Sequence, residues 1–451
     1  RKRVEIAVKP LATVTVRVVD TDGKPIEDAL VRLPAVVWAD GRRVLREASR
    51  LFHESGERGV FRIGNVPAGE YYLRIENPAA IAPRPGEDPL PMITYYPGVT
   101  DFQLATRVMV RGQSIDLGEV RLVRQKVFKV SGAIVRPGLN AASANSRTTL
   151  QFYVRFHDTG SPEDVFPLGR PQAITFANTQ EARFEIGGLP TGTHSIYPSL
   201  MVAGVPVAFE TPKIIVTIRD HDLDGLRIVL PESVNAIGRV VVDGDAPNLL
   251  RGTRLSLRTS EAIRSESLPV AAQRMLVGRT IALDSRSGEF VLRNLSEGIR
   301  YNLMVNELPT GGYVHDLRLN NLSVFDEGSF VASSGEQRLE LEIRTKGGIV
   351  AGEVRDAMNQ LVEEAAVVLV PEAPRRGNSF LYKRTAADAS GKFTFTGVAP
   401  GDYRVLALRV APPTGAEEDP EYLMPFIGRG TAVRTTQGTT SDVQLRVIEP
   451  Q

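Results

Sequence analysis

A thirteen-residue pattern occurs four times in this chain and constrains the fold more than any other feature of the sequence. Each copy has a phenylalanine, an apolar residue two positions later, an aliphatic residue five positions later and a glycine eight positions later. The phenylalanines are Phe61, Phe184, Phe290 and Phe393. Alternating apolar residues are typical of a strand with one buried face, and the glycine indicates a tight turn into a second strand. The pattern therefore predicts four copies of one module, with the phenylalanine in the core of each.

The spacing of the copies sets the size of the module. Successive phenylalanines lie roughly 100 to 125 residues apart, which is the size of one small domain and far longer than a solenoid repeat. The predicted domains are residues 13–124, 125–232, 233–345 and 346–451, preceded by a separate strand within residues 1–12. Because the connections between them are short, we expect the array to be a stiff rod.

Short alternating strands and frequent turn signals predict an all-β fold of tandem antiparallel β-sandwiches. One stretch of the first module is ambiguous. Residues 36–45 contain two apolar runs around Asp40 and Gly41, which favours a β-hairpin. Val44, Leu45 and the apolar residues that follow them would also fit one face of a helix, and we prefer the hairpin.

Three sequence motifs carry a resemblance to a known family. They are V-x-G-x-V-x-D at Val350 to Asp356, A-x-V-x-L at Ala29 to Leu33, and G-x-F-x-F-x-x-V-x-P-G-x-Y at Gly391 to Tyr403. The chain thus resembles, in four copies, the carboxypeptidase regulatory-like domain, a transthyretin-like Greek-key sandwich related to immunoglobulin-like and Cna-B type surface modules. The resemblance implies four Greek-key sandwiches in an extracellular or cell-surface protein, with the periplasm as the alternative location. It also implies modules without catalytic activity, which serve as spacers, adhesive repeats or appendages of secreted enzymes and outer-membrane receptors.

The composition argues against several function classes. With 54 basic and 53 acidic side chains the chain has no net field to attract nucleic acid, and without cysteine it has no disulfide or thiolate metal ligand. No apolar run is long enough to predict a membrane span. None of the five histidines has a glutamate three positions later, so the zinc site of a carboxypeptidase is missing. We therefore expect no enzyme activity, no catalytic residue, no metal and no cofactor.

One acidic loop resembles the start of a calcium site. Asp220, Asp222 and Asp224 alternate along the chain, but Pro231 stands where such a loop would need a bidentate glutamate. We interpret this stretch as a solvated hairpin turn, with calcium binding as the alternative.

Aromatic residues near turns are the candidates for glycan contacts. They are Trp38, Tyr95 and Tyr96, with Tyr422 as a lesser one. The alternative for the tyrosines is packing over the end of a sandwich, and for Trp38 the sequence favours neither role.

The leading functional hypothesis is a structural or adhesive protein that assembles into an extracellular fibre. Val4, Ile6 and Val8 alternate like the final strand of a preceding module, and we expect this strand to pair outside the first module. Its alternative is to fold back as an edge strand. The expected partners are further copies of the chain, joined head to tail, or a polymer of the cell surface or matrix. A glycan-binding array and an accessory region of a larger secreted enzyme or receptor are the alternative functions.

Overall fold

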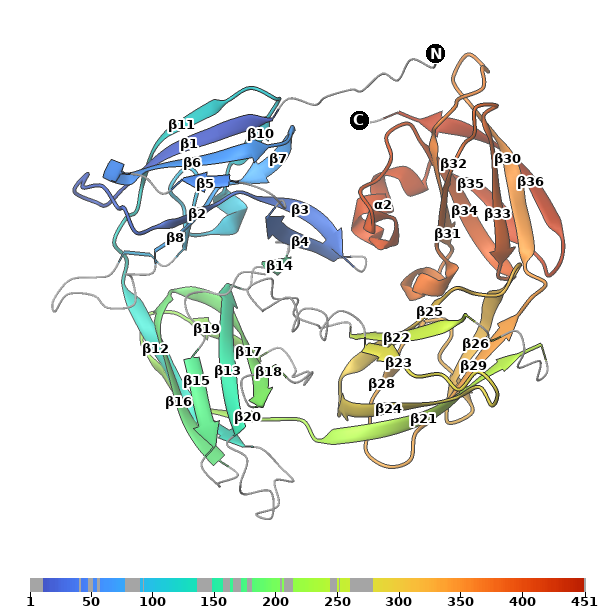
Figure 1. The fold of residues 1–451 in the computed structure, drawn as a ribbon, viewed down its shortest axis with the longest axis horizontal. Coiled ribbons are helices and arrows are strands. Elements are labelled where there is room, and N and C mark those ends of the chain that lie inside the picture. The colour runs from blue at the N-terminus through green and yellow to red at the C-terminus, as the bar shows by residue number, and fades with distance from the viewer. Residues whose placement is uncertain are drawn as a thin grey trace, which may run out of the picture.

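The computed structural model describes residues 11–39, 42–47, 52–54, 57–77, 90–91, 93–135, 148–156, 163–164, 172–176, 181–202, 205–206, 214–243, 250, 252–259 and 279–449. Strands dominate these residues, which confirms the all-β prediction. The strands form four successive groups, here called modules one to four. Figure 1 shows them arranged as a ring, in which module four returns to module one. The prediction of a stiff rod is therefore wrong, because the first and last modules contact each other.

Each of the four modules contains a sheet with the same strand order. The first strand of each module lies between the last strand, which runs parallel to it, and the strand that carries the repeated phenylalanine, which runs antiparallel. In this order the strands are β11 (Ile115–Arg121), β1 (Ala12–Val19) and β6 (Val60–Val66) in module one; β20 (Leu223–Val229), β12 (Val127–Val135) and β16 (Glu181–Pro190) in module two; β29 (Arg338–Arg344), β21 (Ser233–Val242) and β24 (Glu289–Ser296) in module three; and β36 (Thr440–Ile448), β30 (Gly348–Arg355) and β33 (Lys392–Val398) in module four. The parallel pair departs from the antiparallel prediction, because alternation of apolar residues reports which face is buried and not the direction of a neighbour.

The strand that follows the repeated turn belongs to a second set of strands. This set contains β2 (Leu30–Arg32), β7 (Gly69–Tyr72), β8 (Arg74–Glu76), β9 (Ile93–Tyr95) and β10 (Arg107–Val110) in module one; β13 (Thr148–Phe156), β15 (Gln172–Phe176), β17 (Gly192–Val202), β18 (Val205–Pro206) and β19 (Ile214–Ile218) in module two; β22 (Arg254–Thr259), β23 (Arg279–Ile281), β25 (Arg300–Asn306) and β28 (Phe330–Val331) in module three; and β31 (Ala366–Pro371), β32 (Lys383–Ala386), β34 (Gly401–Leu408) and β35 (Thr431–Thr435) in module four. Strands β5 (Phe52–Glu54), β26 (Tyr313–Leu319) and β27 (Leu322–Ser323) extend the first sheets of modules one and three. Apolar side chains from both sets pack into common cores.

A β-bulge explains the spacing of the repeated pattern. The four phenylalanines are only 3–4% exposed, and the apolar residues two and five positions after each of them are also buried. An unbroken strand would bury positions two and four. Instead, two residues of the phenylalanine strand face one residue of the first strand in every module, which shifts the third buried position by one. Asn65, Gly188 and Gly397 occupy the position four residues after the phenylalanine with φ of 60°, 77° and 61°.

An aromatic ring after the turn holds the bulge and the turn together. The Tyr71 hydroxyl donates to the carbonyl of Pro67 at 3.0 Å, and the Tyr403 hydroxyl donates to the carbonyl of Ala399 at 2.9 Å. In module three the hydroxyl of Tyr301 accepts from the Ser296 backbone N–H at 2.8 Å. The pattern aligns Arg300 with these tyrosines, but Tyr301 takes the role, so the turn that lacks proline is one residue longer.

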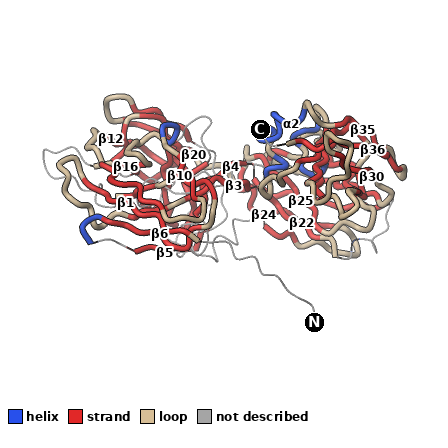
Figure 2. The backbone as a smooth tube through the Cα atoms, turned by 90° about the horizontal axis from the view of Figure 1, so that it is seen from above, coloured by secondary structure: helices blue, strands red, loops and turns tan. Residues whose placement is uncertain are grey.

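The four modules form two pairs, visible as two lobes in Figure 2. Modules three and four share one continuous core, and Arg375 of module four binds Asp326 of module three at 2.8 Å. Modules one and two are joined by Ile93 and Tyr95, which belong to module one and pack in the core of module two. No core cluster among the described residues spans modules two and three.

Candidate functional site

A β-hairpin reaches from module one to module four and closes the ring (Figure 1). It consists of β3 (Pro34–Ala39) and β4 (Arg42–Glu47), which confirms the hairpin over the helix in the described part of that stretch. Trp38 and Arg43 lie directly opposite each other in the pair, so both side chains leave the same face. A short strand of module two, β14 (Glu163–Asp164), pairs in parallel with β4.

Asp419 of module four forms the main hydrogen bond with the hairpin. It is the N-cap of helix α2 (Pro420–Ile427), where its Oδ1 accepts from the backbone N–H groups of Glu421 at 2.9 Å and Tyr422 at 3.3 Å. Its Oδ2 accepts from the indole Nε1–H of Trp38 at 2.8 Å. Asp419 is 6% exposed and Trp38 is half-buried, so this bond is partly shielded from water. One buried carboxylate therefore starts the helix and binds the hairpin.

Packing around the indole completes the contact. The rings of Trp38 and Tyr422 meet edge to face, with centroids 5.1 Å apart and planes at 72°. Gly415 lies against the backbone of Trp38, and its φ of 89° suits a residue without a side chain. Arg43 bonds to Glu421, and its Nε lies 3.8 Å from Oδ2 of Asp419.

We call this set of residues the latch. Its members are Trp38 and Arg43 of module one and Gly415, Asp419, Glu421 and Tyr422 of module four. A hydrogen bond to a charged acceptor contributes about 1.5–3 kcal/mol and an aromatic pair about 0.5–1.5 kcal/mol. The ion pair with Glu421 adds little, because the Glu421 side chain is 68% exposed. These contributions are smaller than those of the hydrophobic core of a module.

The structure places the other glycan candidates inside the protein. Tyr95 is 5% exposed and stacks edge to face on Phe102 at 5.3 Å, and Tyr96 is half-buried against the core of module one. The side chain of Trp38 is occupied by the latch. These positions offer no open aromatic platform, and their role in glycan binding stays an untested prediction.

His194 holds the turn of module two. It stands where modules one and four have a tyrosine, is fully buried, and its Nε2 lies 2.8 Å from the carbonyl oxygen of Pro190. Because a carbonyl oxygen can only accept, Nε2 carries the proton. Burial lowers the pKa of His194 below its ordinary value, although the bond to Pro190 opposes the shift. The imidazole is therefore a neutral donor that replaces the tyrosine hydroxyl.

Acid is expected to destabilise module two through His194. The unfolded chain takes up a proton near the ordinary histidine pKa of about 6.5, whereas the folded module resists it. The stabilising contribution is complete above that pH and is lost as the pH falls toward the lower folded pKa. Amide hydrogen exchange, compared at neutral and mildly acidic pH, should show loss of protection in module two. His194→Tyr should remove this dependence, whereas His221→Gln, at an exposed histidine, should leave it. Equal acid sensitivity in His194→Tyr would refute the assignment.

The acidic loop connects two sheets instead of forming a hairpin. Strands β19 and β20 on either side of it pair with different partners, β17 and β12. Asp222 accepts from the Lys129 backbone N–H at 2.9 Å, and Asp224 accepts from the Ser131 hydroxyl at 2.6 Å. The carboxylates serve separate bonds that tie the loop to β12. Within the described ranges, no group of three or more histidine or acidic side chains is arranged to hold a metal.

Other shifted groups also have structural explanations. Burial raises the pKa of Tyr382 to about 12, and the Tyr382 hydroxyl donates to the carbonyl of Arg376 at 2.8 Å. Burial also raises the pKa of Tyr403 and lowers that of Lys383. No helix in the described part of the chain is long and apolar enough to cross a membrane.

Sequence reasoning missed most of the latch. The sequence indicated Trp38 and Tyr422 as aromatic candidates but did not predict their contact. It gave no role to Asp419 or Arg43. Asp419 before Pro420 is a typical start of a helix, and this signal could have located α2. The candidate strand residues Val4, Ile6 and Val8 lie outside the described residues.

Comparisons with known proteins do not place the chain in a family. No protein-family model matches it, and neither does any curated protein. Among solved structures, a Streptococcal ancillary pilin is 16% identical over 74% of this chain and 99% of its own, with a TM-score of 0.25. The Bacillus anthracis TIE protein is 10% identical over 99% of this chain and 76% of its own, with a TM-score of 0.17. BcpA, the major pilin subunit of Bacillus cereus, is 11% identical over 70% and 99%, with a TM-score of 0.18. Scores this low support no inference about fold or function, and the resemblance to the carboxypeptidase regulatory-like domain stays a prediction.

Proposed function

We propose that this chain is a non-catalytic structural or adhesive protein of the cell surface or extracellular space. In this proposal its four sandwiches form a closed ring that assembles with further copies of itself. The latch is the observation that carries the proposal, because it joins the first and last modules of the array through a part-buried hydrogen bond to a charged carboxylate. A loose string of independent modules needs no such contact. The domain boundaries proposed for the four modules are residues 13–124, 125–232, 233–345 and 346–451.

The use of the ionisable side chains supports a structural role. Tyr71, His194 and Tyr403 each bond to a carbonyl four residues earlier, and Asp419 caps a helix. These four side chains, of types that enzymes use for proton transfer, hold turns and the start of a helix. An active site needs such groups to converge on a substrate instead.

The single tryptophan of the chain provides a direct reporter of ring closure. In the native protein Trp38 is half-buried against Tyr422, so its fluorescence should shift to longer wavelength when the latch opens. Asp419→Asn should open it, because the asparagine oxygen can cap α2 while its amide group cannot accept from the indole. Far-ultraviolet circular dichroism should stay unchanged. An unshifted emission spectrum in Asp419→Asn would contradict the latch.

Negative-stain microscopy tests the function itself. We expect closed rings of four modules at low protein concentration and head-to-tail chains at high concentration. A chain that remains monomeric at every concentration and on its own cell surface would contradict the fibre proposal. Specific retention of that monomer on a polysaccharide column would favour the glycan-binding alternative.

A further inference from the structure

We infer that the latch is also the contact between copies: in an opened chain, the β3–β4 hairpin docks on α2 and Gly415 of a second copy. This inference rests on the proposed function and names the surface that would build the fibre. The occupant of the module four surface is then a second copy of module one.

The position of the latch in the chain makes exchange between copies productive. Trp38 belongs to the first module and Asp419 to the last, so the same contact between two chains joins the head of one to the tail of the next. Such a contact uses two different surfaces and leaves one of each free at the ends. Opened chains that exchange the latch therefore extend into a linear assembly, whereas an unopened chain satisfies the same contact within itself.

The junction between modules two and three is where we infer that the chain opens, because no described core cluster spans it. The Leu230 backbone N–H donates to the carbonyl of Val135 in module two, and the Glu297 N–H of module three donates to the carbonyl of Glu232, the last residue before module three. Only Pro231 separates these two anchored residues. A connection this short restricts how the two lobes can meet within one chain, and short connections favour domain swapping.

The chemistry of the exposed surfaces also points to a second copy as the partner. An opened chain leaves the indole N–H of Trp38 and the guanidinium of Arg43 on one face of the hairpin. Module four then presents Oδ2 of Asp419, the carboxylate of Glu421 and the ring of Tyr422. These two sets complement each other in charge, hydrogen bonding and shape, and every copy carries both.

Protein concentration decides between the two forms. Within one chain, module four is present near the hairpin at an effective concentration on the order of millimolar. A dilute protein therefore closes on itself. Chains held close together on a surface, or concentrated while the latch is open, exchange it.

Two variants with complementary defects test the exchange. Trp38→Ala removes the hairpin side of the latch, and Asp419→Asn removes the module four side. Each variant alone is expected to be an open monomer, shown by light scattering after gel filtration. Native circular dichroism and unchanged amide exchange in the four cores establish that each variant folds, and Trp38→Phe, which keeps the aromatic pair, is the milder replacement.

The mixture gives the decisive result. Trp38 of the Asp419→Asn chain can dock on the intact module four of the Trp38→Ala chain, which restores one latch between two different chains. The expected product at high concentration is a heterodimer that grows no further, because its two free ends carry the two defects. The emission of its only tryptophan should return to the wild-type wavelength.

Other outcomes separate this inference from the proposed function. A mixture that behaves as the sum of two monomers overturns the exchange. Filaments that persist in both single variants also overturn it but leave the fibre function standing, and their loss on deleting residues 1–9 would then assign assembly to the first strand. A heterodimer without wild-type filaments on cells or in solution supports the exchange and refutes the fibre function.

Discussion

Replacing Phe393 with alanine is expected to lower the unfolding free energy of module four by about 3–5 kcal/mol, because removal of the buried phenyl side chain leaves a cavity. Phe393 is 3% exposed, packs edge to face on Phe395 at 5.8 Å, and lies opposite Gly352 in the neighbouring strand. Since modules three and four share one core, both should lose protection together. Urea unfolding followed by amide hydrogen exchange measures the size and the extent of the effect.

Val410→Ala is the matched control for Phe393→Ala. Val410 lies in the same module and is 62% exposed, so its truncation should change the unfolding free energy very little. A loss in Phe393→Ala as small as that in Val410→Ala would contradict the assignment of the phenylalanine to the core. It would also remove the basis for treating the four repeated patterns as equivalent.

Gly352→Ala is expected to produce the second large loss, about 1–3 kcal/mol or more from overpacking. A methyl group at this position would lie 1.8 Å from the carbonyl oxygen of Val443, on the parallel strand β36. That atom belongs to the backbone of a paired strand, so it cannot move aside without breaking the pairing of β30 with β36. Thermal unfolding of the full chain, with exchange protection read in module four, measures the effect.

Gly428→Ala supplies the comparison for Gly352→Ala. Gly428 has helical φ and ψ at the end of α2, and a methyl group there meets no atom within 4 Å. This substitution should be neutral or slightly stabilising, because alanine has less backbone freedom to lose on folding. Equal stability of the two variants would show that the first and last strands of module four are not packed as described.

The repeated pattern made the modules predictable because its spacing records burial directly. The phenylalanines, the buried positions after them and the turn all follow from one strand with a bulge. The bulge itself was hidden in the spacing of two and five, which differs from simple alternation by one residue. The sequence did not predict the longer turn of module three. Only the structure shows that Tyr301 bonds to the backbone of the turn there, as Tyr403 does in module four.

The ring was not predictable from the same signals. Trp38 and Asp419 are 381 residues apart, and local patterns contain no information about which distant surfaces meet. The short connections between modules predicted a stiff array, and modules three and four do share one core, which includes Val350 and Leu341. They could not report the direction in which each junction turns, which sets the difference between a rod and a ring.

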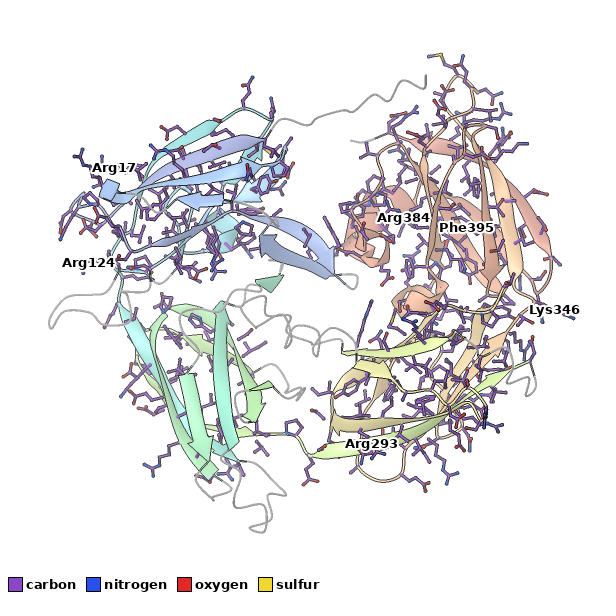
Figure 3. All side chains as sticks on the ribbon, viewed as in Figure 1. Arg17, Arg124, Arg293, Lys346, Arg384 and Phe395 are labelled. Carbon is purple, nitrogen blue, oxygen red and sulfur yellow. The ribbon has the colours of Figure 1, made fainter. Side chains whose placement is uncertain are left out.

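Figure 3 shows the side chains, with Arg124 near the junction of modules one and two and Lys346 near the junction of modules three and four. These two junctions lie within the lobes, and the second junction and the latch lie between them.

Because the chain has no cysteine, spin labels can be placed on single introduced cysteines without removing any native cysteine. Leu104 in module one and Met358 in module four are 66% and 81% exposed, so labels there should not disturb the cores.

The distance distribution between labels on Leu104→Cys and Met358→Cys, measured by pulsed electron paramagnetic resonance, tests ring closure most directly. At low protein concentration the closed ring predicts one narrow distance distribution. When Asp419→Asn is introduced into the same labelled chain, this distribution should broaden and shift to longer distances. A broad distribution in the labelled chain with an intact latch, unchanged by Asp419→Asn, would contradict the closed ring.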